Sequence, residues 1–546
     1  MSSQKKTRYI FVMGGVLSGL GKGIATSSIG TLLTYSGYNV TALKIDPYIN
    51  VDAGTMNPTE HGEVFVTKDG LETDQDIGNY ERFLDKEMTK DNYMTQGMVW
   101  SSVIEKERNL EYGGITVQPF KHIAEEIINR IKHLGKVSKA DFVLIEIGGT
   151  VGEYENLIFL EAARRMRIET PDSVRHIMVS YLPIPAMVGE MKTKPTQTAV
   201  NTLNAAGIQP DFILTRSSKP LDKKRKEKIS YYCNVPAGHV ISSEDVESIY
   251  KVPLLYQDQK FDELIQKSFG MRPKKSALGE WNKTLVKSGK NNKTINIAMI
   301  GKYFATGEFT LSDSYISVIE ALKSAGIHQK VDVEFTWVSS EDFEKNKKKL
   351  SYLDQFDGIV VPGGFGSRGV EGIIAAIGYA RKNNIPYLGL CYGMQLATIE
   401  FARNVAGIKE AHTTEIKPKA KHPVIDVMND QKKLIAENRY GGTMRLGDYS
   451  CALKAGTHAR RLYKKKDIVE RHRHRYEFNN KYRDKLEKAG LIIAGLNTKR
   501  DLVEIIELPD HPYFVGVQFH PEFKSRPMRP HPVFTGLIEA AKNKHS

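Results

Sequence analysis

Hydrophobic residues in the first half of the chain gather in short runs that are apolar at nearly every position, separated by segments of helical periodicity. Strands covered by helices on both faces have this pattern, whereas strands with one solvated face alternate. We therefore expect a parallel sheet flanked by helices. The predicted strands are YIFVM (9–13), NVTALKI (39–45), DFVLIEI (141–147), HIMVSYL (176–182) and DFILT (211–215).

The same alternation begins again in the second half, after a stretch of different character. Residues 271–294 are polar and basic with little periodicity, and we interpret them as a linker. An amphipathic helix is expected after Pro532. The chain is thus predicted to be an α/β protein with two parallel-sheet domains, residues 1–270 and 295–546. The predicted strands of the second domain are 295–300, 331–338, 356–361, 385–390, 502–508 and 514–519.

Composition supports two globular domains. A chain of 546 residues exceeds the size at which one core keeps growing, and no apolar run approaches the roughly 18 residues needed to span a bilayer. Only three cysteines are present, without CxxC spacing, so neither a disulfide framework nor a cysteine zinc site is indicated. A reducing, cytoplasmic location fits this composition best.

The net charge of +14 calls for an anionic partner. Much of the positive charge lies in residues 219–228, 345–349 and 465–475. No aromatic-interleaved basic motif, finger spacing or heptad zipper accompanies these runs. We therefore expect solvated basic faces and nucleotide-phosphate sites, with neither nucleic acid nor a membrane as partner.

A glycine-rich segment, GGVLSGLGKGIATSSIGTLL (14–33), follows the first predicted strand and continues as a helix. Glycines let backbone amides point at phosphate oxygens, the helix dipole favours anions, and Lys22 would neutralise the outer phosphates. The strict GxxxxGK[ST] pattern is not met, because Val16 occupies the first glycine position and Gly23 replaces the magnesium-holding hydroxyl. The segment predicts a phosphate site whose metal is held elsewhere. The alternative is a tight strand-to-helix turn.

Carboxylates near strand ends are candidates for the missing magnesium ligands. Glu146 ends the run DFVLIE, Asp74 lies in ETDQDIGNYERF, and Asp46 ends LKID. Ligands of open parallel sheets bind at the carboxyl ends of strands, and magnesium prefers oxygen ligands. Asp74 and Glu146 are the preferred pair; a simple loop acid is the alternative for Asp74.

The segment KTKPTQ (192–197) places two lysines and two threonines before a helical run. Backbone amides and cationic side chains at a helix start suit a second anion site. An ordinary helix cap remains the alternative.

Cys391 lies between two glycines in LGLCYGMQ, after an apolar run and before a helical pattern. The spacing G-x-Cys-x-G predicts a nucleophile elbow, in which a sharp turn exposes the side chain and the flanking glycines tolerate the strain. The helix start favours a reactive thiolate. A buried structural cysteine is the alternative.

A base for this thiol is predicted in VQFHPEF (517–523). His520 and Glu522 are two residues apart, so in an extended strand they point to the same side, and Glu522 would fix the imidazole tautomer. The turn PGGFGSRG (362–369) and the amide of Tyr392 are expected to stabilise an oxyanion. These pieces predict a Cys-His-Glu triad.

Three motifs of the second half, PGGFG, GLCYGMQ and QFHPEF, resemble those of class I glutamine amidotransferase domains. The whole chain resembles the CTP synthase family, because GGVLSGLGKG, ETDQDIGNYERF, EIGGTVGEYE, KTKPTQ and ERHRHRYEFNN occur in order. The resemblance implies an N-terminal, P-loop-like synthetase domain that binds ATP and UTP, and a C-terminal, flavodoxin-like glutaminase domain.

The resemblance also implies the roles of individual residues. Cys391, His520 and Glu522 would be catalytic, and Asp74 and Glu146 would hold magnesium. The implied ATP contacts are Gly19, Leu20, Gly21, Lys22, Gly23, Ile24, Asp74, Glu244, Asp245 and Val246. The implied UTP and CTP contacts are Ser18, Glu153, Tyr154, Glu155, Lys192, Thr193, Lys194, Pro195, Thr196, Gln197 and Lys228. The implied glutamine contacts are Gly364, Tyr392, Gly393, Met394, Gln395, Glu415 and Arg475.

By the same resemblance, ATP would phosphorylate O4 of UTP, and ammonia from glutamine would then displace phosphate to give CTP. Magnesium would be the cofactor, CTP a feedback inhibitor, GTP an allosteric activator and a homotetramer the assembly. Ammonia is mostly protonated at neutral pH, so a shielded passage between the domains is expected.

Two alternatives share some of these motifs. One is an ATP-dependent ligase that amidates a carboxylate, which product absorbance would distinguish because only a new cytosine ring changes the near-ultraviolet spectrum. The other is a partitioning-type ATPase that binds DNA and carries a non-catalytic second half. The intact set of Cys391, His520 and Glu522 argues against the latter.

Overall fold

The structure is a computed structural model that describes residues 6–15, 17–187, 189–286, 292–301, 305–306, 309–310, 312–428, 431 and 441–544. Val16, the predicted departure from the phosphate-loop pattern, lies outside them. The chain forms two compact units: unit 1 comprises residues 1–52 and 79–286, and unit 2 comprises 53–78 and 287–546. The later boundary falls inside the predicted linker. The sequence pattern did not indicate that residues 53–78 belong to unit 2.

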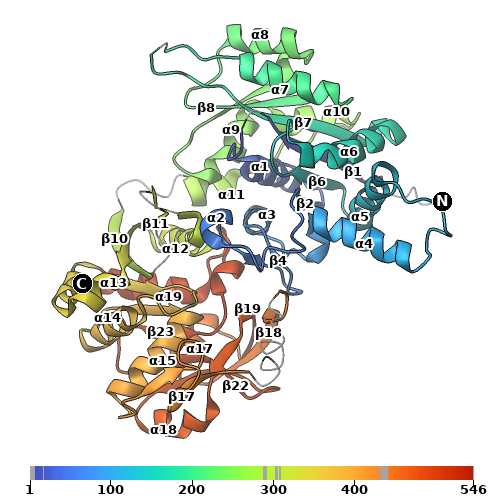
Figure 1. The fold of residues 1–546 in the computed structure, drawn as a ribbon. Coiled ribbons are helices and arrows are strands. Elements are labelled where there is room, and N and C mark those ends of the chain that lie inside the picture. The colour runs from blue at the N-terminus through green and yellow to red at the C-terminus, as the bar shows by residue number, and fades with distance from the viewer. Residues whose placement is uncertain are drawn as a thin grey trace. The chain divides into compact units, whose positions relative to one another are not determined.

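In the described part of unit 1, seven parallel strands form one sheet in the order β5-β2-β6-β1-β7-β8-β9. Figure 1 labels β1, β2, β6, β7 and β8 of this sheet. The five predicted strands are confirmed, with β5 and β9 added at the two edges. The bounds are β5 Tyr93–Thr95, β2 Val40–Asp46, β6 Phe142–Ile147, β1 Arg8–Gly14, β7 Val174–Tyr181, β8 Phe212–Ser217 and β9 Val240–Glu244.

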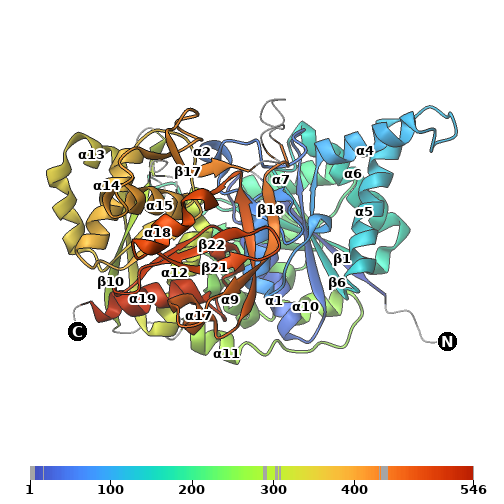
Figure 2. The same cartoon turned by 90° about the horizontal axis from the view of Figure 1, so that it is seen from below.

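Helices cover both faces of this sheet. Figure 2 shows α5 (Ala124–Val137) and α6 (Leu157–Glu169) on one side of β1 and β6, and α1 (Lys22–Tyr35) and α10 (Phe261–Ser268) on the other. The continuous apolar runs of the strands are explained by this double cover. Further helices are α4 Gln96–Arg108, α7 Lys194–Ala205, α8 Lys223–Cys233 and α9 Val252–Asp258.

The first half of the predicted linker packs into unit 1. Trp281, in the short helix α11 (Gly279–Trp281), is fully buried, and its indole N–H donates to the Tyr250 carbonyl at 2.8 Å. Its ring also contacts Tyr35 and Phe83. Trp281 therefore anchors the first half of the predicted linker to unit 1, although the polar composition of this segment is typical of a flexible linker.

Nine strands of unit 2 form a mixed sheet in the part of the chain that the structure describes, in the order β13-β10-β14-β15-β23-β22-β21-β18-β19. The first five are parallel, and the last four extend the sheet antiparallel. The α/β class is confirmed, but this sheet is only partly parallel. The bounds are β13 Val331–Ser339, β10 Lys293–Gly301, β14 Gly358–Val361, β15 Tyr387–Leu390, β23 Phe514–Val517, β22 Leu502–Glu507, β21 Ile492–Asn497, β18 Arg445–Leu453 and β19 Asp467–His474.

Helices also lie on both faces of the parallel part of this sheet. Figure 2 shows α14 (Val370–Lys382) and α15 (Tyr392–Asn404) on one side, and α12 (Ile316–Gln329) and α19 (Pro532–Asn543) on the other. The expected final helix is therefore confirmed as α19. Among the described residues, every helix is too short or too polar to cross a membrane.

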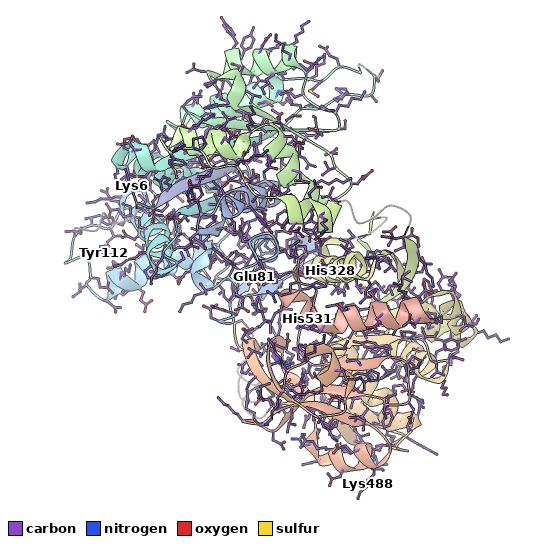
Figure 3. The ribbon with its side chains drawn as sticks, turned by 180° about the vertical axis from the view of Figure 1, so that it is seen from behind. Lys6, Glu81, Tyr112, His328, Lys488 and His531 are labelled. Atoms are coloured by element: carbon purple, nitrogen blue, oxygen red, sulfur yellow. The ribbon has the colours of Figure 1, made fainter. Side chains whose placement is uncertain are left out.

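The basic run 465–475 is only partly the solvated face that its composition predicts, because Lys465 and Lys466 are exposed whereas Arg471 and His472 are not. It contains the whole of β19, in which Arg471 and His472 are fully buried. Arg471 donates to the Val66 carbonyl at 3.0 Å, and Glu470 contacts the ring of His531, labelled in Figure 3, at 3.1 Å. The prediction is wrong for residues 470–472, because partners inside the unit satisfy their polar groups, whereas residues 465–467 are exposed as expected. Residues 345–349 and most of 219–228 are exposed, as expected.

Candidate functional site

Cys391 occupies the turn between β15 and α15, where it is the residue that caps the helix start. Its backbone has φ 49° and ψ −96°, a conformation that residues with a side chain rarely adopt. Neither Gly389 nor Gly393 has positive φ, so the strain lies in the cysteine itself. The glycines are needed for space, because a Cβ on Gly393 would collide with the Val361 carbonyl oxygen.

His520 and Glu522 follow β23, the neighbour of β15 in the sheet. The Nδ1 atom of His520 lies 2.7 Å from Oε1 of Glu522, and the imidazole stacks on Phe523. Glu522 belongs to a 3-10 turn (Pro521–Lys524), so it does not reach the ring through the extended geometry that we expected. The turn achieves the same pairing by folding the carboxylate back.

Electrostatics favour a protonated His520. Burial acts to lower its pKa, but the Glu522 carboxylate and Cys391 together outweigh burial and raise the pKa to about 10. An imidazolium beside the sulfur would stabilise a thiolate.

Cys391, His520 and Glu522 line one cavity of about 100 Å³. The segment 53–78 contributes Glu63 and Val64 to its wall, and the Glu63 carboxylate accepts the backbone N–H of Ser317 at 3.1 Å. The other lining residues are Ser314, Tyr315, Val318, Gly363, Gly364, Phe365, Arg473 and Phe523. A larger hollow of about 510 Å³, near Asp426 and Lys481, includes none of the predicted site residues.

The predicted oxyanion loop follows β14, the other neighbour of β15. Gly364 lies against the ring of Tyr392, whose hydroxyl donates to the Gly366 carbonyl at 2.8 Å. The Gly366 N–H donates to Glu415 at 2.9 Å. The loop, the helix start and Glu415 are therefore held together.

The remaining implied glutamine contacts are less uniform in position. Gly393, Met394 and Gln395 are buried within α15, and Gln395 donates to the Tyr476 carbonyl at 2.9 Å. Arg475 donates to Gln431 at 2.7 Å. The side chains of Met394 and Gln395 are therefore packed inside unit 2 and are not among the residues that line the cavity.

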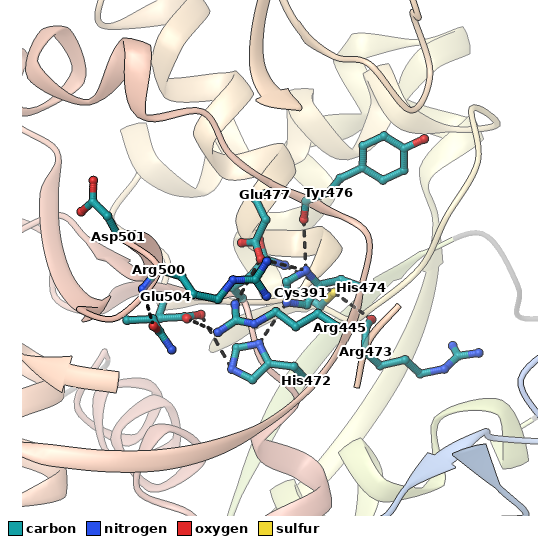
Figure 4. A network of polar contacts seen from close by, with 12 residues as sticks. Cys391, Arg445, His472, Arg473, His474, Tyr476, Glu477, Arg500, Asp501 and Glu504 are labelled. Carbon is teal, nitrogen blue, oxygen red and sulfur yellow. Dashed lines mark hydrogen bonds and ion pairs between the residues drawn. The ribbon is translucent and has the colours of Figure 1, made fainter. Parts of the chain in front are cut away.

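A buried ionic network lies behind the nucleophile (Figure 4). Arg445 is paired with Glu477 at 3.1 Å and with Glu504 at 2.6 Å. Burial raises the pKa of Glu477 to about 8 and also raises the pKa of Glu504, so one arginine is matched by carboxylates that hold an extra proton. Arg445 therefore offsets part of the cost of burying the two carboxylates.

The same network fixes β19 against the active site. The rings of His472 and His474 are joined at 2.9 Å, and burial lowers the pKa of both, which keeps them neutral. The residue between them, Arg473, presents its carbonyl oxygen to the Cys391 sulfur at 3.8 Å (Figure 4). Its guanidinium points to Glu72, at 2.7 Å.

The predicted phosphate loop joins β1 to α1 in unit 1. Gly21, with φ 75°, caps the helix without a side-chain hydrogen bond, which leaves the first amides of α1 to an outside acceptor. Lys22 is buried over the loop, and its ammonium donates to the Gly149 carbonyl at 2.6 Å. Ser18 and Gly19 are exposed, whereas Leu20 and Gly23 are buried and Ile24 is half-buried.

The predicted metal-binding acids lie in different units. In unit 1, Glu146 at the end of β6 accepts the Tyr80 hydroxyl and lies 3.6 Å from the Lys44 ammonium. Lys44 is also 3.6 Å from Asp46 at the end of β2. In unit 2, Asp74 accepts the N–H of Asp76 at 2.8 Å.

The other implied nucleotide residues mostly follow strands β6 to β9 at their carboxyl ends, as ligand sites of parallel sheets do. Thr193 precedes α7, with Gln197 donating to its hydroxyl at 3.1 Å. Lys192, Lys194, Pro195 and Thr196 complete that segment. Glu153, Tyr154 and Glu155 lie between β6 and α6, Glu244 ends β9, Asp245 and Val246 follow it, and Lys228 is exposed on α8.

Comparison with known proteins covers both units. Residues 8–271 match the family model of the CTP synthase N-terminus, and residues 310–540 match class-I glutamine amidotransferase. The chain is 52% identical over 538 residues to the CTP synthase of Pyrococcus furiosus, with 98% of each chain covered. The CTP synthase of Caldanaerobacter subterraneus is 51% identical over 537 residues, again with 98% of each covered. The chain belongs to the CTP synthase family.

A solved structure of the Trypanosoma brucei CTPS glutaminase domain with bound acivicin is 38% identical. It covers 46% of this chain and 95% of its own, with a TM-score of 0.42. As a CTP synthase family member, the chain is a ligase that converts UTP to CTP with ATP and nitrogen from glutamine. The alternatives of a carboxylate-amidating ligase and a DNA-partitioning ATPase are thereby set aside.

Sequence reasoning missed several residues of this CTP synthase family site. Lys44 and Tyr80 contact Glu146, and Arg216 approaches the phosphate loop, since its guanidinium would lie 3.8 Å from a Cβ on Gly21. A lysine inside an otherwise apolar strand was a signal for Lys44. Tyr80 and Arg216 carried none, because their partners are distant in sequence.

The substitution Glu522→Gln is expected to lower the pKa of His520, because the carboxylate is the main group that raises it. A raised pKa stabilises the folded state fully below the ordinary value of 6.5, and this stabilisation is lost as the pH rises through about 10. Between these pH values the melting temperature of the wild type should fall as the stabilisation is lost. The melting temperature of the variant should fall less over the same range. NMR titration of the His520 imidazole measures the shift directly, and an unchanged titration would contradict the assignment.

Proposed function

We propose that this enzyme makes CTP through a phosphorylated UTP, with ammonia produced at Cys391. The observation that carries the proposal is that a strained cysteine beside a His-Glu pair lies in unit 2, whereas the lysine-containing phosphate loop lies in unit 1. One unit has the groups for amide cleavage, and the other has the groups for phosphoryl transfer.

In the glutaminase half, the Cys391 thiolate attacks the carboxamide carbon of glutamine. Amides of Gly364 and Tyr392 stabilise the tetrahedral oxyanion. His520 gives its proton to the leaving nitrogen, so ammonia departs and a thioester remains. Water then attacks the thioester, His520 accepts the proton, and glutamate leaves with the thiolate restored. Glu522 holds the ring in place throughout.

In the synthetase half, Lys22 and the amides at the start of α1 hold the phosphates of ATP. Transfer of the terminal phosphoryl group makes O4 of UTP part of a good leaving group; ammonia adds at C4, and phosphate departs with O4. Magnesium, when bound, neutralises charge on the phosphate oxygens. Glu146 and Asp46 would supply oxygen ligands that fit this ion, since both carboxylates lie near the ends of neighbouring parallel strands, β6 and β2, each 3.6 Å from the Lys44 ammonium. Asp74 is the further ligand that we propose.

Regulation follows the family pattern in this proposal. CTP binds near Glu153, Tyr154 and Glu155 as a feedback inhibitor, GTP is an allosteric activator, and the active assembly is a homotetramer. The position of Glu153 supports the first point, because its carboxylate lies against Gly149, which also accepts the Lys22 ammonium.

An oxygen label tests the phosphorylated intermediate. UTP that carries oxygen-18 at O4 is expected to transfer the label to inorganic phosphate, because the C4–O4 bond breaks while the new O4–P bond persists. Mass spectrometry of the phosphate measures the transfer, and UTP labelled at O2 is the matched control that should leave its label in CTP. Unlabelled phosphate from the O4-labelled substrate would exclude the intermediate.

A further inference from the structure

Gln518 is a buried amide beside the reactive sulfur. It follows β23 directly, is fully buried, and its backbone N–H donates to the Glu504 carbonyl at 2.8 Å. Its side-chain nitrogen Nε2 lies 3.7 Å from Sγ of Cys391, within the range of an N–H···S hydrogen bond. His520 approaches the same sulfur from two residues further along the chain.

The orientation of this amide follows from its neighbours. Gln395 Nε2 donates to the Tyr476 carbonyl at 2.9 Å, and a carbonyl oxygen only accepts, so the amino group of Gln395 must face this way. The same amino group lies 3.4 Å from Oε1 of Gln518. The oxygen of Gln518 therefore faces Gln395, and its amino group faces the sulfur.

These contacts form one chain of hydrogen bonds, in which Gln395 donates to the Tyr476 carbonyl and to Gln518, and Gln518 donates to Cys391. It runs from the Tyr476 carbonyl through Gln395 and Gln518 to Cys391, and all three side chains are buried. An N–H that points at an anion in a dry site is a charge-assisted donor, which is stronger than its neutral counterpart. The chain fixes that donor in advance, so no reorganisation is needed when the negative charge forms.

We propose that Gln518 is a further catalytic residue of the glutaminase site, because its amide N–H stabilises the Cys391 thiolate before attack and again when the thioester is cleaved. Before attack and after cleavage, the sulfur is a thiolate with a free electron pair. In the thioester between these steps, that pair forms the carbon–sulfur bond. The donor interaction is therefore stronger in the free thiolate than in the thioester. This inference rests on the proposed nucleophilic role of Cys391.

Two substitutions of similar size separate this role from simple packing. Gln518→Met keeps the volume but removes the donor, and Gln518→Glu replaces the donor with a carboxylate. Thiolate formation is measured by the rate of alkylation with iodoacetamide from acid to alkaline pH. The Cys391→Ala variant gives the background from Cys233 and Cys451, which are both buried.

The pH of half-maximal alkylation is expected to rise by about one unit in Gln518→Met, since a hydrogen bond to a charged group is worth about 1.5 kcal/mol. It should rise further in Gln518→Glu, and kcat for glutamine hydrolysis should fall in the same order. Melting curves identify any variant that has failed to fold. A folded Gln518→Met enzyme with the wild-type alkylation profile would overturn the proposal.

The same measurements distinguish this inference from the proposed function. If Cys391 were not the nucleophile, Cys391→Ala would keep glutamine hydrolysis, whatever Gln518 does. If Gln518 only filled space, both of its variants would be less stable, but their alkylation profiles would coincide with that of the wild type. The donor role is supported if the pH of half-maximal alkylation rises from the wild type to Gln518→Met and again to Gln518→Glu.

Discussion

Replacement of Cys391 by alanine is expected to abolish glutamine-dependent CTP synthesis while ammonia-dependent synthesis continues. The thiolate is the atom that would form the thioester, and loss of a nucleophile of this kind lowers kcat by about four orders of magnitude or more. Ammonia added to the solution would bypass the missing step, since the phosphate loop with Lys22 lies in the other unit. The absorbance change from UTP to CTP measures both reactions on one sample.

Cys451 provides the matched control for this experiment. It is also a buried cysteine of unit 2, in β18, but it is absent from the cavity that contains His520 and Glu522. Cys451→Ala should retain glutamine-dependent synthesis. Loss of both reactions in a folded Cys391→Ala enzyme would contradict the division of labour between the units.

Replacement of Lys22 by alanine is expected to stop CTP synthesis from either nitrogen source. The ammonium is the cation of the phosphate loop, and a buried charge that stabilises developing negative charge contributes about two to three orders of magnitude to the rate. Hydrolysis of glutamine to glutamate should persist, since Cys391 is untouched. Rates with ammonium chloride and with glutamine, measured at saturating ATP and UTP, test the prediction.

Lys136→Ala is the matched control for the loss of one positive charge. Lys136 is exposed in the last turn of α5, before the start of β6, so it lies at the opposite edge of the sheet from the phosphate loop. This variant should synthesise CTP normally. Wild-type turnover in Lys22→Ala would refute the role assigned to the lysine.

Local patterns in the sequence predicted much of the fold and the central chemistry. The apolar runs predicted the strands, and the candidate catalytic residues and the glycine loop were each predicted at the end of a strand. Cys391, His520 and the loop 362–369 do follow neighbouring strands, β15, β23 and β14. The motifs predicted these strand ends, but not that the three strands are neighbours in the sheet.

Features that depend on distant partners could not be predicted in this way. The segment 53–78 joins unit 2 through contacts such as that of Phe65 with Phe523, whose ring centroids lie 4.7 Å apart. No local periodicity reports such a contact. The composition of β19 predicts a solvated face, because the carboxylates that pair with its arginines, Asp448 with Arg471 and Glu72 with Arg473, come from other segments.

The twisted backbone of Cys391 has a consequence for evolution. A residue held at φ 49° and ψ −96° costs about 1–3 kcal/mol of folding stability, which natural selection tolerates only while nitrogen transfer is needed. A descendant that lives on environmental ammonia would gain robustness by replacing this cysteine with glycine, which adopts the conformation without penalty. Loss of the activity would then be visible in a genome as a glycine codon at this one position, while the rest of the domain stays intact.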